Sequence, residues 1–302
     1  DNPELYFQAV TYTGNGSSQS VTLDGDENMQ PDLVWVKNRS TTEHHVVYDS
    51  VRGVNKVIYP NQVNDQDSES NGVSSFDSDG YSMTNTNGAL NGSGESMVAW
   101  CWKGGTTSGI TTTGADITPA SYSFNQTSGF SIISFDGNGE DGGTKIAHGL
   151  GGAPEFLISK RIANANYWAV FHKSDNTDYL VLDTTAAFSD APIWKDTDPT
   201  SVYYQVDNST SVNASSGEMI VYSWRSIQGF SQIGSYKGNG NADGSFIYTG
   251  FKPAFVICKK INNAEDWGMW GHYPAYNLID RFLYGNSNTA ESTGIAPGDF
   301  LS

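Results

Sequence analysis

The stretch that decides the fold is Gly14-Asn15-Gly16, because the chain repeats it as Gly137-Asn138-Gly139 and Gly238-Asn239-Gly240. An aromatic residue stands two positions before each copy, and a proline follows each copy at nearly the same distance. A lysine comes six residues after each proline. These landmarks are Tyr12, Pro31 and Lys37, then Phe135, Pro154 and Lys160, then Tyr236, Pro253 and Lys259. A spacing kept through several landmarks indicates an internal repeat.

The repeat predicts how the chain is divided. The first unit covers residues 1–103, the second covers 129–228 and the third covers 229–302. Residues 104–128 are rich in Gly, Thr and Ser, which predicts a linker with weak β character. The second and third units follow each other without a linker.

Composition and patterning predict that every unit is built from β-strands. The chain contains 33 glycines and 13% aromatic residues, which suits short strands joined by tight turns. In the first unit, strands are expected at 7–12 and 20–23, on either side of the Gly-Asn-Gly reversal. Residues 32–37 are apolar on both faces of the expected strand. This pattern is typical of a strand between two packed layers, so the sequence predicts β-sandwiches.

The third unit is expected to be incomplete. Phe300 lies as far along the chain from Gly238 as Phe76 lies from Gly14. Beyond this point the first unit continues from Asp77 to Trp102, whereas the third has only Leu301 and Ser302. An unfinished sandwich exposes a strand edge and apolar core. Two explanations stay open: the remaining residues lie outside this sequence, or another chain adds a strand.

The third unit is nevertheless expected to begin as the second does. Gly229-Phe230 matches Gly129-Phe130, so a first strand is predicted from Phe230.

Net charge and cysteine usage exclude several classes of partner. The formal net charge of −17 argues against nucleic acid, which requires a basic surface, and against an anionic membrane face. No apolar run approaches the ~20 residues that span a bilayer, so no membrane insertion is expected. Cys101 and Cys258 lie in strands of different units, which favours separate thiols over a disulfide.

The motifs that carry chemistry are not found. The paired-carboxylate pattern of a sandwich glucanase and the Gly-x-Ser-x-Gly elbow are both missing. The five histidines lack metal-binding spacing, and the acidic clusters do not complete a calcium loop. We therefore expect no catalytic residue, no metal and no cofactor. The recurring lysines are expected to have a structural role at the end of a strand.

Two sets of residues are candidate sites. Trp168, Trp267 and Trp270 recur at fixed repeat positions, so they are either flat platforms for sugar rings or packing residues. His45 occupies the position of Trp168 and Trp267 in the first unit. Six asparagines lie in Asn-x-Ser/Thr sequons and are glycosylation candidates: Asn15, Asn38, Asn91, Asn125, Asn208 and Asn213.

Several long motifs also resemble a family of tailed-phage structural proteins, found in tail-fibre-like virion proteins. They are Tyr12-Thr13-Gly14-Asn15-Gly16, Gln30-Pro31-Asp32-Leu33-Val34-Trp35-Val36-Lys37-Asn38-Arg39, Asp49-Ser50-Val51-Arg52-Gly53, Val98-Ala99-Trp100-Cys101-Trp102-Lys103 and Gly234-Ser235-Tyr236-Lys237-Gly238-Asn239-Gly240. The resemblance covers nearly all of the chain. It implies a concanavalin A-like jelly roll for each repeat, a virion or extracellular structural role, and no enzymatic residues. The sequence departs from the family after Ser302, where a strand segment normally follows.

Together these observations predict an all-β protein of three tandem jelly-roll-like β-sandwich repeats, the third incomplete. The expected function is that of a non-enzymatic extracellular or virion structural protein, a component of a phage tail or tail fibre. Its expected partners are copies of itself, with a host-surface glycan as a further candidate. Two alternatives remain, a filament subunit joined head to tail by strand complementation of the third repeat and a carbohydrate-binding adhesin. A polysaccharide-cleaving enzyme is less favoured than either.

Overall fold

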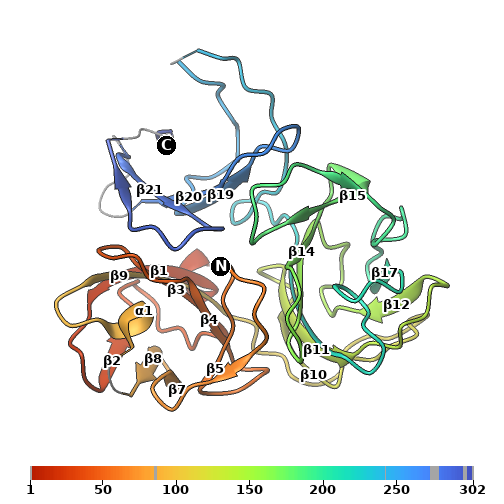
Figure 1. Ribbon diagram of the computed structural model, residues 1–302, viewed down its shortest axis with the longest axis horizontal. Helices are drawn as coiled ribbons and strands as arrows, with labels where there is room; N and C mark the ends of the chain where they lie inside the picture. Colours follow the sequence, from red (N-terminus) through yellow and green to blue (C-terminus); the bar gives the residue numbers. More distant parts are fainter. Residues whose placement is uncertain (1, 85–86, 242, 273–278, 295–297, 301–302) are drawn as a thin grey trace.

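The computed structural model describes residues 2–84, 87–241, 243–272, 279–294 and 298–300, and it is an all-β structure. The helices among these residues are short: the 3-10 turn η1 (Pro3–Leu5) and the single turn α1 (Gly88–Asn91). No helix in the described ranges is long and apolar enough to cross a membrane. Three lobes surround a common centre (Figure 1), and they contain β1–β9, β10–β18 and β19–β22.

The first lobe packs two antiparallel sheets against each other. Their strand orders are β1-β9-β3-β4 and β2-β8-β7, and β5 and β6 form a separate pair. The strands are β1 (Phe7–Thr13), β2 (Gln19–Thr22), β3 (Leu33–Asn38), β4 (Val46–Asp49), β5 (Lys56–Val57), β6 (Asp67–Ser68), β7 (Val73–Asp77), β8 (Gly80–Met83) and β9 (Ser96–Trp102). The expected strands on either side of the first Gly-Asn-Gly turn, and the one after Pro31, are therefore confirmed.

The second lobe repeats this strand order. Within its seven-stranded sheet, β11-β18-β13-β14 corresponds to β1-β9-β3-β4, and the opposing pair β12-β17 corresponds to β2-β8. The strands are β10 (Ser121–Asn125), β11 (Phe130–Asp136), β12 (Thr144–Ala147), β13 (Phe156–Arg161), β14 (Ala169–His172), β15 (Asp175–Val181), β16 (Ser189–Asp190), β17 (Tyr203–Val206) and β18 (Glu218–Trp224). Strand β10 lies in the expected linker, at the sheet edge beside β11.

The third lobe has one sheet, in the order β19-β20-β21-β22. Its strands are β19 (Phe255–Lys259), β20 (Trp267–Gly271), β21 (Arg281–Tyr284) and β22 (Ser292–Thr293). Counted from the repeated proline and lysine, β19 corresponds to β3 and β13, and β20 to β4 and β14.

The predicted first strand of the third unit is wrong, because the described residues between β18 and β19 form no strand. They extend as a long loop away from the body of the molecule (Figure 1). The physical reason lies in strand pairing. Strands β1 and β11 are held by β9 and β18, and the described part of the third lobe has no counterpart of β9 or β18. A strand without a hydrogen-bonded partner does not recover the entropy lost on ordering its backbone.

Strands with two apolar faces separate two layers of core. In β3, Leu33 and Trp35 pack into a central cluster shared by all three lobes, and Val34 and Val36 pack into the interior of the first lobe. Strand β9 divides its side chains in the same way. The second lobe has an equivalent interior of its own. The prediction of a strand between two packed layers is confirmed.

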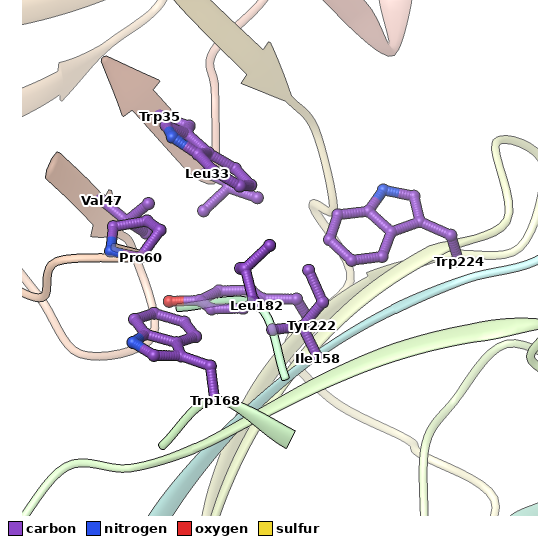
Figure 2. A pocket seen from close by; sticks show the side chains of 9 residues that line it. All are labelled: Leu33, Trp35, Val47, Pro60, Ile158, Trp168, Leu182, Tyr222 and Trp224. Carbon is purple, nitrogen blue, oxygen red and sulfur yellow. The ribbon is translucent and has the colours of Figure 1, made fainter. Parts of the chain in front are cut away.

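The central cluster is closely packed where the first two lobes meet. Figure 2 shows nine side chains around a cavity of about 10 Å³. They are Leu33, Trp35, Val47 and Pro60 from the first lobe and Ile158, Trp168, Leu182, Tyr222 and Trp224 from the second. The lining of this space is apolar and a stable water needs two to four polar partners, so the junction is dry core.

Three equivalent main-chain contacts join the lobes into a closed ring. In each, the carbonyl eight residues after the repeated proline accepts a hydrogen bond from an amide of the neighbouring lobe. The three pairs are Gln66 N to Ile162 O at 3.0 Å, Phe188 N to Ile261 O at 2.9 Å and Glu291 N to Arg39 O at 2.9 Å. The second lobe thus binds the first, the third binds the second, and the first binds the third.

Candidate functional site

Two of the three tryptophans predicted as ligand platforms lie inside the molecule. Trp168 is 1% exposed and Trp267 is 2% exposed. The Trp168 indole N–H donates to the carbonyls of Tyr59 and Gln62 in the first lobe, at 3.0 and 2.9 Å. The Trp267 indole N–H donates to the Val181 carbonyl in the second lobe at 2.9 Å. Neither ring offers a face to a sugar, so the packing alternative describes them.

Trp270 is half-buried and stacks on Phe282, with ring centroids 5.7 Å apart. The carbohydrate-binding hypothesis therefore depends on this one tryptophan of the three.

His45 makes the third contact of the same kind. Its Nδ1 accepts from the Trp35 indole at 2.9 Å, so its Nε2 carries the proton and donates to the Tyr284 carbonyl of the third lobe at 3.0 Å. Burial, and then the nearby Lys37 ammonium, lower the pKa of His45 to about 3. The neutral histidine therefore joins its lobe to a neighbouring one by a hydrogen bond to a carbonyl, as Trp168 and Trp267 do.

We expect stability to fall as the pH is lowered from about 6.5 towards 4. Burial lowers the folded-state pKa of His45 to about 3 and of His148 to about 4. The unfolded chain, with ordinary histidine pKa values, therefore binds more protons in this range. Each histidine contributes a slope of about 1.4 kcal/mol per pH unit. Urea unfolding of the His45→Gln variant should show a shallower slope, because the glutamine amide has both an acceptor and a donor but does not titrate. An unchanged slope would contradict this role.

The recurring lysines do have a structural role. Lys160 Nζ donates to the Val63 carbonyl of the first lobe at 2.8 Å and to the Asn166 carbonyl. Lys259 Nζ donates to the Thr185 carbonyl of the second lobe at 3.2 Å. Burial lowers the pKa of Lys37 and of Lys160 to about 8. The ammonium groups of Lys160 and Lys259 thus bind main-chain carbonyls of the neighbouring lobe.

Three of the six sequon asparagines are buried and three are not. Asn38, Asn91 and Asn213 are fully buried, so a glycan cannot be attached there in the folded chain. Asn15 and Asn208 are exposed and Asn125 is half-buried. Both cysteines are free, with Cys101 buried and Cys258 half-buried.

The buried Asn91 and Asn213 instead hold the first two Gly-Asn-Gly turns. The Asn15 amide donates to Asn91 Oδ1 at 2.8 Å, and the Asn138 amide donates to Asn213 Oδ1 at 2.9 Å. Each of these asparagines precedes the last strand of its lobe. We call residues 91–102 and 213–224 the closing segments, because each completes its lobe by locking the turn and then pairing as β9 or β18.

Close main-chain approach explains why the first two turns begin with glycine. A Cβ on Gly14 would lie 2.8 Å from the Asn91 carbonyl carbon, and one on Gly137 would lie 2.7 Å from that of Asn213. The Gly14 and Gly137 amides also donate to the closing segments, at 2.9 and 3.0 Å. The third glycine position differs, since a Cβ on Gly238 would meet no atom within 4 Å.

This difference predicts opposite effects of the same substitution. Gly137→Ala forces the backbone of the turn away from the closing segment and should cost about 1–3 kcal/mol of unfolding free energy. Gly238→Ala should stay within about 0.5 kcal/mol of the wild type, because its surroundings are open. Chemical denaturation of the two variants provides the comparison. Equal losses would contradict the open environment of the third turn.

The third turn has the same shape as the other two. Gly240 has a φ of 71°, close to 64° for Gly16 and 68° for Gly139. The Asn239 side chain accepts from the Asn241 amide at 3.0 Å, as Asn15 does from Ser17 at 2.8 Å. The turn is therefore formed, but among the residues that the structure describes no closing segment contacts its glycines.

The open turn lies in the same lobe as an open sheet edge. Strand β3 lies between β9 and β4, and β13 lies between β18 and β14. Within the described residues, β19 pairs with β20 alone, and all five of its residues are only half-buried.

Apolar side chains are exposed in the loop before this edge. Tyr236, Phe246, Ile247 and Tyr248 are 54%, 75%, 49% and 81% exposed. The equivalent of Ile247 is buried in both complete lobes, as Val21 and as Ile146. The third lobe thus presents a locking turn, a free strand edge and uncovered apolar residues, which together form the candidate assembly site.

Two other kinds of functional site, a metal site and a ligand pocket, are less well supported. In the described part of the chain, no three His, Cys, Asp or Glu residues lie close enough to hold a metal ion. A hollow of about 120 Å³ lies in the second lobe, lined by Thr111, Gln126, Gly149, Gly151, Ser201 and Val202. Pockets for small organic ligands are typically larger, about 300–1,000 Å³.

The turn-binding role of Asn91 and Asn213 is not predicted by the sequence analysis, which gives them only as sequons. Each lies six residues before a methionine, Met97 or Met219, at the start of the last strand. This shared spacing is the sequence signal for the role.

Fold and site together define an all-β protein of three joined lobes, one of them lacking its closing strand among the described residues. The chain belongs to the family described as a domain of unknown function (DUF7483), whose profile matches residues 2–302. No curated protein and no solved structure matches the chain.

Proposed function

We propose that this protein is a non-enzymatic structural component that assembles into a multimer outside the cell or on a virion, as in a phage tail or tail fibre. Each lobe is proposed to be a jelly-roll-like sandwich module, with the third unfinished. The strand order shared by the first two lobes supports the repeated module. The phage part of the proposal depends on the resemblance of the sequence motifs to those of tail-fibre-like proteins.

One observation carries the proposal: the third lobe combines a free β19 edge with exposed apolar side chains. Soluble proteins normally cover or blunt such edges, because they recruit other strands. Contiguous exposed apolar residues likewise mark interaction surfaces. The ring of inter-lobe hydrogen bonds makes the remaining body a suitable rigid building block.

The solution mass of the purified chain tests the proposal. A fixed small oligomer, seen by light scattering and as a defined particle or fibre in micrographs, is the expected result. A monomer at every concentration would overturn it.

The free β19 edge also favours a second candidate, a filament subunit joined head to tail by strand complementation. Open-ended growth with increasing concentration would select the filament over the small oligomer.

A further inference from the structure

We propose that the junction between the first and third lobes is an acid-sensitive switch: protonation of His45 separates these two lobes, while the junctions that join the second lobe to its neighbours stay closed. The inference goes beyond the proposed structural role. It does not depend on assembly, because it concerns contacts within one chain.

The first–third junction differs from the other two at a pair of equivalent positions, eight and fourteen residues after the repeated proline. The residues there are Ile162 and Trp168 at the first–second junction, Ile261 and Trp267 at the second–third junction, and Arg39 and His45 at the first–third junction. Two junctions are therefore apolar at these positions, and the remaining one is ionisable.

An ion pair takes the place of an apolar side chain at the first–third junction. Arg39 Nε and Nη2 donate to the two carboxylate oxygens of Glu291, each at 2.8 Å. The two side chains are 13% and 5% exposed, so the pair is largely shielded from water. Arg281 Nη1 adds a second guanidinium at 3.5 Å from Glu291 Oε2. Charged groups thus carry a contact that apolar side chains make at the other junctions.

The recurring lysine also differs at this junction. Lys160 and Lys259 each donate to a carbonyl of the neighbouring lobe. Lys37 donates instead to the Asn38 carbonyl of its own lobe, at 2.5 Å. Its ammonium group is close enough to His45 to oppose a second positive charge there. This lysine therefore acts on the junction through its charge.

Protonated His45 does not fit the closed junction. The neutral ring accepts from the Trp35 indole through Nδ1 and donates to the Tyr284 carbonyl of the third lobe through Nε2. An imidazolium carries an N–H on both nitrogens, so its Nδ1–H would point at the Trp35 N–H. Since His45 is 0% exposed, water does not supply another acceptor. Opening the junction gives the charged ring access to water.

The groups around this histidine do not offset the cost of its charge. From its own lobe, the Lys37 ammonium and the His44 ring face it, and both disfavour a further positive charge. Glu43 and, from the third lobe, Glu291 act on Lys37, whose positive charge they favour. The Tyr284 carbonyl favours the imidazolium, but it already accepts a hydrogen bond from the neutral ring.

Acid therefore favours the open junction. In the closed form, burial and then the Lys37 charge lower the pKa of His45 to about 3. Once exposed, the ring regains the ordinary histidine pKa of about 6.5. Between these values the open form binds a proton that the closed form does not. The open population should consequently rise about tenfold per pH unit between about pH 5.5 and 4.

Two other buried titratable groups belong to other parts of the molecule. His148 bonds within the second lobe, to the Leu150 amide and the Thr200 carbonyl, each at 3.1 Å. Its protonation weakens that lobe and does not act on a junction. Asp49 lies at the first–second junction, where its charge is paired with Arg52 Nε at 2.5 Å. Opening by acid is therefore expected first between the first and third lobes.

Hydrogen exchange at three equivalent amides tests the inference in the unmodified chain. The Gln66, Phe188 and Glu291 amides each bond across one junction, so they report the three junctions separately. Exchange is measured between about pH 7 and 4 and divided by the intrinsic rate, while circular dichroism verifies that the chain stays folded. Protection of the Glu291 amide should fall about tenfold per pH unit below about pH 5.5, and that of the other two should stay nearly constant. An equal fall at all three amides, or constant protection at Glu291, would overturn the proposal.

A variant shows whether His45 is the titrating group. His45→Gln has a donor and an acceptor but does not titrate, so the Glu291 amide should keep its protection as the pH falls. His172→Gln is the matched control, because His172 is a half-buried histidine of the second lobe that bonds to Ser174. It should leave the fall at Glu291 unchanged. A folded His45→Gln chain with the pH dependence of the wild type would refute the switch. If this variant does not fold, the three amides of the wild type still decide.

Discussion

Trp168→Ala is expected to lower the free energy of unfolding by about 3–5 kcal/mol, the usual cost of deleting a large buried aromatic side chain. The ring is 1% exposed at the junction of the first two lobes (Figure 2), where it lies beside Ile158 and Tyr222. Its loss also leaves the Tyr59 and Gln62 carbonyls without the indole donor. Urea unfolding followed by circular dichroism measures the effect.

Trp270→Ala is the control, since Trp270 is a tryptophan of the third unit that is half-buried. It should cost less than half as much. A second variant, Trp168→Phe, keeps an aromatic ring and removes the donor, so it should fall between the two. If Trp168→Ala were no more destabilising than Trp270→Ala, the junction would not hold the lobes together.

Asp49→Ala should be comparably damaging, at about 3–5 kcal/mol, because it leaves a buried guanidinium without its counter-charge. Asp49 Oδ2 accepts from Arg52 Nε at 2.5 Å and from the Tyr222 hydroxyl of the second lobe at 2.6 Å. The Asp49 and Arg52 side chains are 0% and 1% exposed. Thermal and urea unfolding of the variant would give the loss.

Two comparisons show whether the buried charge is the cause. Lys173→Ala breaks an exposed ion pair with Glu155 and should cost at most about 1 kcal/mol. The double variant Asp49→Leu with Arg52→Met removes both charges, so it should recover much of the loss. A double variant as unstable as Asp49→Ala would mean that packing around Asp49, rather than the unpaired Arg52, sets the cost.

Local and periodic features of the fold could be predicted from the sequence. Apolar residues on both faces of the strand around Trp35 indicate a strand between two layers, and the spacing from Gly14 to Lys37 identifies its relatives in the other lobes. These signals lie within short stretches of sequence, where strand period and turn chemistry act directly. Within the described residues β19 pairs with β20 alone, and the incompleteness of the third unit stays a prediction.

The ring of inter-lobe contacts and the asparagine contacts that hold the first two turns could not be predicted in the same way. Their contacts join residues far apart in sequence, such as Arg39 with Glu291 and Asn15 with Asn91. Nothing in the sequence around Trp168 distinguishes a surface platform from a lobe junction, because an apolar ring suits both. The prediction of a first strand in the third lobe is wrong for a related reason, because the local sequence pattern does not show whether a pairing partner exists.

The closed arrangement of the lobes has a consequence for how the stability of the molecule is shared. Each lobe contacts both of the others, so separating any one lobe breaks two of the three equivalent main-chain hydrogen bonds. Lobes joined end to end would lose only one such contact when a terminal lobe separates. Closing the ring therefore couples the opening of each lobe to the other two.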